Sequence, residues 1–174
     1  MMNTAKIGFL GAGRMATAIA GGMVKAGFDP AQMMAYDCSA EAGRAFTEAA
    51  GVATVGGTAV LAEQCDALVL AVKPQYLAAA LDGLGRALRE KLIISIVAGV
   101  KLEKLAALTE ARRVIRVMPN TPALVGASCG AYAVSDAVSD TDRVLAQRIL
   151  AAIGDFSELA ESHLDAVTAV SGCG

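Results

Sequence analysis

Short apolar runs alternate along much of the chain with longer segments in which apolar residues recur at helical spacing. The runs predict β-strands over residues 5–10, 33–36, 52–55, 67–72, 92–97 and 113–118. The segments between them predict helices over residues 15–26, 40–50, 60–64, 76–89 and 102–108. Continuously apolar strands that alternate with helices are typical of a predominantly parallel sheet with helices on both faces. The sequence therefore predicts a Rossmann-like α/β fold.

The alternation changes after Pro122. Residues 128–134 predict a strand with no helix before it, which we expect to join the sheet antiparallel through a short connection. Ser139 is expected to cap a helix that runs to about residue 153. Beyond it we expect a last edge strand over residues 156–159 and a helix over residues 163–170.

Hydrophobic residues make up 55% of the 174 residues and are spread along the chain. No window approaches the roughly 18–20 uninterrupted apolar residues of a membrane span. Residues 92–100 come nearest, but Ser95 and Gly99 interrupt them, and they predict a buried parallel strand. Residues 1–24 are apolar enough to suggest a signal peptide, but two glycines and an arginine break the run. We therefore expect a cytoplasmic protein without a membrane span.

Charge and cysteine spacing bear on two further classes of function. The chain has 15 Lys and Arg against 17 Asp and Glu, and its densest basic spot is only the pair Arg112-Arg113. We therefore expect no nucleic-acid partner. His163 is the only histidine, and no cysteines form a Cys-x-x-Cys pair, so we expect no metal site. The cysteines, expected as reduced thiols, are Cys38, Cys65, Cys129 and Cys173.

Residues 11–16 read Gly-Ala-Gly-Arg-Met-Ala, between the first predicted strand and the first predicted helix. In such a turn Gly11 permits the tight bend, Gly13 lets a pyrophosphate approach the backbone, and Ala16 lets the helix pack on the strand. The helix N-terminus then offers unpaired N–H groups to the phosphates. The alternative is a turn without a ligand, but the strand-turn-helix context favours a dinucleotide site. Its candidate residues are Gly11, Ala12, Gly13, Arg14, Met15 and Ala16.

Asp37 follows the second predicted strand, near the spacing at which an acidic residue binds the ribose hydroxyls of NAD. It is equally compatible with a turn or cap residue before Ser39. Arg44 is an alternative partner for the 2′-phosphate of NADP, although it lies a turn into the next helix. The residues therefore leave NAD(H) and NADP(H) both open as the cofactor.

Four further segments resemble one enzyme family, pyrroline-5-carboxylate reductase, in their order and spacing. They are AVKPQ (71–75), SIVAGV (95–100), VIRVMPNTPA (114–123) and DAVTAVSGCG (165–174). The last resembles that family's entry into its C-terminal helical domain. The resemblance implies reduction of 1-pyrroline-5-carboxylate, a small-molecule substrate, to L-proline with NAD(P)H, which is the final step of proline biosynthesis. Hydride would pass from the nicotinamide to C5 of the ring imine.

The resemblance also implies roles for residues at the strand ends. In the family, residues like Ala71, Val72, Lys73 and Pro74 line the cofactor, and residues like Ile96, Val97 and Ala98 lie against its nicotinamide half. Lys73 would hold phosphate or carboxylate charge, and the alternative is a lysine that emerges into solvent. Asn120 and Thr121, between two prolines, would orient cofactor or substrate by hydrogen bonds, and the alternative is a structural turn.

Two residues depart from the family pattern. Thr58 stands where an asparagine is expected near the adenosine end of the cofactor, although threonine can still donate and accept a hydrogen bond. Cys173 stands where the family has a second serine, a small-for-small change. Hydride transfer needs no nucleophile, so we assign none to Cys173.

The resemblance divides the chain into a dinucleotide-binding domain, residues 1–160, and the start of an all-α C-terminal domain, residues 161–174. In the family that domain carries the dimer interface and a loop for the substrate carboxylate, which we expect beyond Gly174. We therefore expect a homo-oligomer formed through it and a catalytic acid that the present residues do not identify. Residues 1–174 alone are expected to hold cofactor but to turn over poorly or not at all.

Two other functions stay open. One is a β-hydroxyacid dehydrogenase of the 6-phosphogluconate dehydrogenase type, which shares the glycine turn. The segments 72–74 and 118–122 argue against it. The other is a dinucleotide-sensing module without catalysis.

Overall fold

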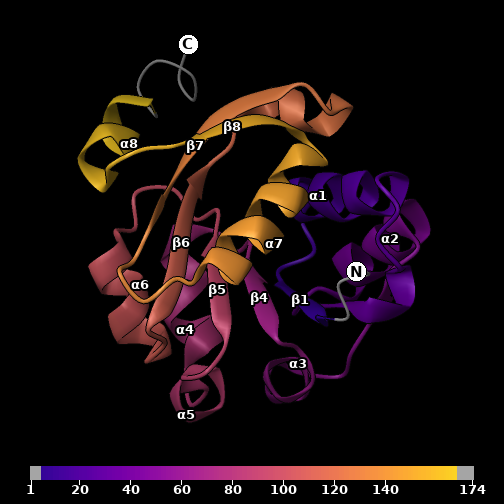
Figure 1. The fold of residues 1–174 in the computed structure, drawn as a ribbon. Coiled ribbons are helices and arrows are strands. Elements are labelled where there is room, and N and C mark those ends of the chain that lie inside the picture. The colour runs from indigo at the N-terminus through magenta and orange to yellow at the C-terminus, as the bar shows by residue number, and fades with distance from the viewer. Residues whose placement is uncertain (1–4, 168–174) are drawn as a thin grey trace.

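The structure, a computed structural model, describes residues 5–167, and these contain an eight-stranded sheet (Figure 1). The strands are β1 (Ile7–Leu10), β2 (Met33–Tyr36), β3 (Ala53–Thr54), β4 (Ala67–Leu70), β5 (Leu92–Ser95), β6 (Arg113–Met118), β7 (Ser128–Val134) and β8 (Gly154–Glu158). Their order across the sheet is β3-β2-β1-β4-β5-β6-β7-β8. All neighbours pair parallel except β6 and β7, which are antiparallel. The predicted Rossmann-like fold class is therefore confirmed.

Helices cover both faces of this sheet. They are α1 (Arg14–Lys25), α2 (Ala40–Ala50), α3 (Thr58–Gln64), α4 (Leu77–Leu81), α5 (Gly85–Leu88), α6 (Leu102–Thr109), α7 (Asp140–Ala151) and α8 (Glu161–Val167), with short 3₁₀ turns η1 (Pro30–Gln32), η2 (Pro74–Tyr76) and η3 (Thr121–Val125). Helices α1, α2 and α7 pack on one face, and α3 to α6 pack on the other. Helix α8 packs against β7 beside α6.

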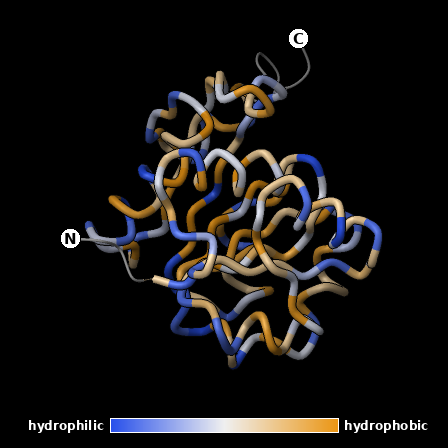
Figure 2. Tube along the Cα trace, turned by 90° about the vertical axis from the view of Figure 1, so that its right-hand side faces the viewer, coloured by the Kyte–Doolittle hydropathy of each residue, from blue (hydrophilic) through white to orange (hydrophobic). Residues whose placement is uncertain are grey.

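Successive residues of the central strands enter opposite cores. Ile94 belongs to the core under α1 and α7, whereas Ile93 belongs to the core under α3 to α6. Because both faces are buried, the strands need apolar residues throughout, which explains the continuous runs in the sequence. Figure 2 shows these hydrophobic strands in the interior of the trace. Within residues 5–167, none of the helices is both long and apolar enough to cross a bilayer.

The predicted single helix over residues 76–89 is wrong. The chain instead forms η2 and two short helices, α4 and α5, separated by residues 82–84. Asp82 leaves the helical conformation, and Gly83 takes a φ of 73°, which a helix cannot contain. The amphipathic pattern continues across the break because Leu81, Leu84 and Leu88 all enter the same core. Periodicity alone therefore did not reveal the interruption.

The elements after Pro122 agree with their predictions. Strand β7 joins β6 antiparallel over the predicted residues, and β8 forms the edge of the sheet. Helix α8 begins two residues earlier than predicted, at Glu161. The predicted continuation of that helix over residues 168–170 lies outside the described residues.

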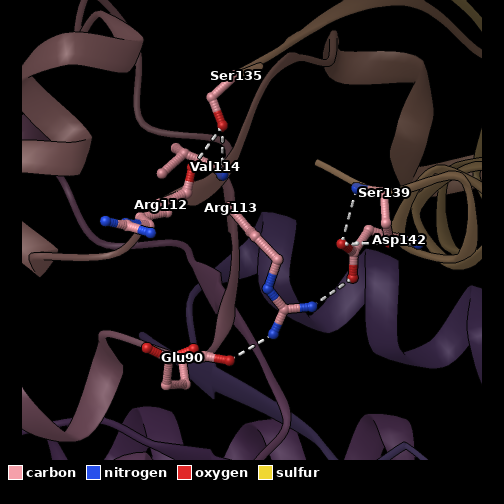
Figure 3. A network of polar contacts seen from close by, with 7 residues as sticks. All are labelled: Glu90, Arg112, Arg113, Val114, Ser135, Ser139 and Asp142. Carbon is pink, nitrogen blue, oxygen red and sulfur yellow. Dashed lines mark hydrogen bonds and ion pairs between the residues drawn. The ribbon is translucent and has the colours of Figure 1, made fainter. Parts of the chain in front are cut away.

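An arginine fastens α7 to the start of β6 (Figure 3). Arg113 Nη1 donates to Asp142 Oδ1 at 2.8 Å, and its Nη2 donates to the backbone carbonyl of Glu90. Asp142 also completes the capping box of α7, because its Oδ2 accepts from the backbone N–H of Ser139. One carboxylate thus caps the helix and binds it to the sheet.

A second arginine holds α8 against the opposite face of β6. The side chain of Arg116 is only 4% exposed, and its guanidinium donates to Glu161 Oε1 at 3.2 Å and to Asp165 Oδ1 at 2.8 Å. The same Glu161 oxygen accepts the backbone N–H of Leu102, the first residue of α6, at 2.7 Å. We name Arg116, Glu161 and Asp165 the α8 clamp, since together they bind α8 to β6 and to the start of α6.

Candidate functional site

The glycine turn is packed against the neighbouring strand ends. Gly11 has a φ of 100°, and its N–H donates to the carbonyl of Tyr36 at 2.8 Å. A Cβ at this position would lie 2.7 Å from the carbonyl oxygen of Ala71. Glycine is therefore required at position 11 for both its backbone conformation and its close approach to the chain after β4. Ala16 is buried, as expected for a residue that packs α1 on the sheet.

The start of α1 has the properties of an anion site. Gly13 precedes the helix in extended conformation, and a Cβ there would meet nothing within 4 Å. No side chain caps the helix, and its first turn has no acidic residue. By contrast, Ser39 and Ser139 cap α2 and α7, and Glu161 accepts the first N–H of α6. The start of α3 is also uncapped, but this seven-residue helix has no basic residue, whereas α1 begins with Arg14. The N–H groups at the start of α1 are thus left for an external acceptor.

A groove of about 650 Å³ runs from this turn between α1 and α2. Small residues line most of it, with Arg14 at its start and Leu124 of η3 beside it. Arg14 is exposed and is the first residue of α1. Its guanidinium therefore adds a positive charge next to the open N–H groups.

Asp37 links β2 to the glycine turn. Its Oδ2 accepts the N–H of Ala12 at 2.8 Å, and its Oδ1 accepts the N–H of Ser39 at 2.8 Å. The second bond is the turn role that the sequence left open. The first was not predicted, because it joins residues far apart in the chain. Binding of a ribose by Asp37 stays a prediction.

The candidate residues after β4 and β5 lie at the same edge, because the two strands are parallel and in register. Lys73, Pro74 and Ala98 are exposed, whereas Ala71, Val72 and Ile96 are half-buried. Val97 is buried in the core under α3 to α6. Its side chain therefore packs in the core beneath this edge, and its backbone is the part that a ligand could contact.

Asn120 holds the loop after β6 to the start of β7. Its Oδ1 accepts from Ser128 Oγ at 2.9 Å and from the N–H of Cys129 at 3.2 Å. The carboxamide oxygen is thus engaged within the protein, as the structural alternative for this segment implied. Thr121 is exposed at the start of η3. The sequence did not indicate a role for Ser128, because its partner lies across a strand pairing that the local pattern does not show.

Thr58 also lies at the carboxyl edge, because it follows β3, which pairs parallel with β2. It is half-buried and begins α3, after the edge strand β3. Cys65 is buried beside Gly8, and this burial raises the pKa of its thiol to about 11, so it is a packing residue rather than a nucleophile.

The expectations for the end of the chain concern residues 168–174. Cys173 and Gly174 belong to this segment, which lies outside the described part of the chain. The substrate loop expected beyond Gly174 therefore stays a prediction, as does the catalytic acid that no residue was assigned to supply.

The first 99 residues decide the family. Residues 6–99 match the model of the family described as NADP oxidoreductase coenzyme F420-dependent. The chain belongs to this family. The match begins before β1 and ends after β5, so this NADP oxidoreductase family shares the region that contains the glycine turn, Asp37 and the edge residues 71–74 and 96–98.

Over nearly its whole length, this member of the family is similar to pyrroline-5-carboxylate reductases. It is 42% identical to that of Pseudomonas aeruginosa over 178 residues, which cover 99% of this chain and 64% of the relative. The Coxiella burnetii enzyme has a TM-score of 0.93 at 31% identity, over 99% of this chain and 65% of that one. The Plasmodium falciparum enzyme, solved with NADP bound, has a TM-score of 0.87 at 32% identity, over 100% and 64%.

These matches confirm the resemblance that the strand-end segments predicted. The chain spans 64–65% of the length of these three relatives.

Proposed function

We propose that the chain binds a nicotinamide dinucleotide along the carboxyl edge of its sheet. One observation carries this proposal: the uncapped start of α1, where Gly13 faces open space and the N–H groups have no side-chain acceptor. The strand order supports it, since it reverses between β1 and β4 and ligands of open α/β sheets bind at such a point. In this proposal the N–H groups of α1 and the Arg14 guanidinium hold the pyrophosphate.

We propose further that the whole protein reduces 1-pyrroline-5-carboxylate to L-proline. The similarity to reductases of this name supports the substrate. The bound NAD(P)H would supply hydride to the ring imine. The chain's own part is to hold and orient the dinucleotide, with the half-buried Ile96 and exposed Ala98 against its nicotinamide half and Lys73 as a cation at the same edge.

We propose the following domain organisation, assembly and further contacts. Residues 1–160 form the dinucleotide-binding domain and residues 161–174 the start of an all-α domain, through which the longer protein forms a homo-oligomer in the cytoplasm. Thr58 contacts the adenosine end, and Asn120 and Thr121 orient cofactor or substrate. For Asn120 this leaves the Nδ2 group, since Oδ1 is bound to Ser128 and Cys129.

The proposed reaction is tested with the complete product of the gene and synthetic 1-pyrroline-5-carboxylate. We expect consumption of NADH or NADPH, followed at 340 nm, with formation of one proline per dinucleotide. The control uses 6-phosphogluconate with NAD⁺ or NADP⁺, which a β-hydroxyacid dehydrogenase would oxidise and this protein should not. Dinucleotide binding without consumption would instead favour the sensing module.

A further inference from the structure

We propose that Asp37 makes this protein select NADH over NADPH. The inference rests on the proposed function, because it assumes that the dinucleotide lies along the carboxyl edge of the sheet. The family match and the similar structure with NADP bound leave the preference of this chain undecided. The residues at the end of β2 decide it, since the adenosine ribose of a dinucleotide lies there.

The position of the Asp37 carboxylate is fixed by two backbone donors. The N–H of Ala12, inside the glycine turn, and the N–H of Ser39, before α2, each donate to one of its oxygens at 2.8 Å. The carboxylate therefore bridges the end of β2, the turn that would hold the pyrophosphate, and the start of α2. Its half-buried side chain has no second position available without breaking one of these bonds.

This arrangement suits ribose hydroxyls. A carboxylate has about four lone-pair sites, of which the two N–H groups occupy two. The others can accept hydrogen bonds from the 2′- and 3′-hydroxyls of NADH. The two backbone bonds hold them in place before the ligand arrives, so little ordering is needed on binding.

The same arrangement opposes a 2′-phosphate. In NADPH the 2′-hydroxyl donor is replaced by a dianionic group, which cannot donate to the carboxylate and is repelled by its charge. Within residues 5–167, no Lys or Arg pairs with Asp37 to offset this charge.

Arg44, the alternative 2′-phosphate partner, faces away from this point. Residues three and four apart share a face of a helix. On α2, Gly43, Phe46 and Ala50 face the sheet. The groove towards α1 is lined by Ala42, Ala45 and Ala49. Arg44 belongs to neither set and is exposed on the outer face. Of these two charged candidates, Asp37 and not Arg44 therefore lies at the end of β2.

The test measures the dissociation constants of NADH and NADPH for the 174-residue chain by nicotinamide fluorescence. We expect NADH to bind at least about tenfold more tightly than NADPH. Asp37→Asn should shift this ratio by about tenfold towards NADPH, and Asp37→Glu, which retains the charge, should preserve the NADH preference. The ratio is the readout because any general weakening of the turn affects both dinucleotides alike.

Asp66→Asn is the matched control. Asp66 also accepts a backbone N–H at 2.8 Å, that of Lys6, but at the amino edge of the sheet, so its loss should leave the ratio unchanged. A wild-type preference for NADPH, or an unchanged ratio in Asp37→Asn, would overturn the role of Asp37 while leaving the proposed function intact. Binding of neither dinucleotide by the wild type would overturn both.

Discussion

Gly13→Val should abolish measurable binding of both NADH and NADPH, a loss of at least about 100-fold, while the chain stays folded. The valine side chain would project into the open space before α1, where the pyrophosphate is proposed to lie against the backbone. The fold tolerates it because Gly13 has a φ of −76° and a Cβ there meets no atom within 4 Å. The free energy of unfolding should change by about 1 kcal/mol or less.

Gly21→Val provides the control for this variant. Gly21 lies within α1, about 12 Å along the helix axis from Gly13, and a Cβ there also meets nothing within 4 Å. It lines the part of the groove that is remote from the glycine turn, beyond the proposed position of the pyrophosphate. Its variant should bind both dinucleotides as the wild type does. Fluorescence titration measures dinucleotide binding and urea unfolding measures stability, so a loss of binding is separated from a loss of folding. Wild-type affinity in Gly13→Val would contradict the placement of the pyrophosphate.

Arg116→Met should lower the free energy of unfolding by about 2 kcal/mol. Methionine fills the space of the apolar stem of Arg116, but it cannot donate to the α8 clamp carboxylates. Glu161 is then partly buried and, within residues 5–167, keeps the Leu102 N–H as its donor. Urea unfolding monitored by circular dichroism measures the loss.

The matching exposed pair, Arg89 with Glu110, should matter far less. Its side chains are 60% and 50% exposed, so Arg89→Met should cost about 0.5 kcal/mol or less. Equal losses in the two variants would show that burial of Arg116 adds nothing.

The α8 clamp also predicts a difference in acid. The Arg116 guanidinium, which donates to Asp165, holds the pKa of that carboxyl below its ordinary value of 3.8. Because the pKa of Asp165 is lower in the folded chain than in the unfolded one, the ion pair stabilises the fold fully at pH values above 3.8. This stabilisation is lost as the pH falls towards and below the pKa of the folded state. The difference in free energy of unfolding between wild type and Arg116→Met should therefore become smaller below pH 3.8. A constant gap down to about pH 2 would show that Asp165 is not bound in solution.

The sequence predicted the framework of the fold because its strands are buried on both faces. A strand such as β5 is buried at every position, and the helices between the strands keep their own period, so the order of elements was visible. Parallel pairing then places the ends of β1, β4 and β5 at one edge, which brings the candidate residues together. The break at Gly83 was missed because the leucines on either side of it stay in phase.

The contacts within the site could be predicted only in part. Local spacing placed Asp37 before α2, but its bond to Ala12 depends on how β2 pairs with β1. Asn120 was chosen for its hydrogen-bonding groups, yet the antiparallel return of β7 brings Ser128 to its oxygen. Ile96 and Val97 both follow β5, but they pack against the cores on opposite faces of the sheet. Which of the two is fully buried depends on the packing of the helices on each face.

We have proposed that a nicotinamide dinucleotide lies across the carboxyl edge of the sheet, on the start of α1. Amide chemical shifts of the ¹⁵N-labelled chain, recorded during titration with NADH, test it directly. We expect the largest shifts at residues 12–16, 37–39, 71–73 and 96–98, and none at Lys6 and Asp66 on the opposite edge. Absence of shifts at residues 12–16, or a set of shifts centred on the amino edge, would contradict it.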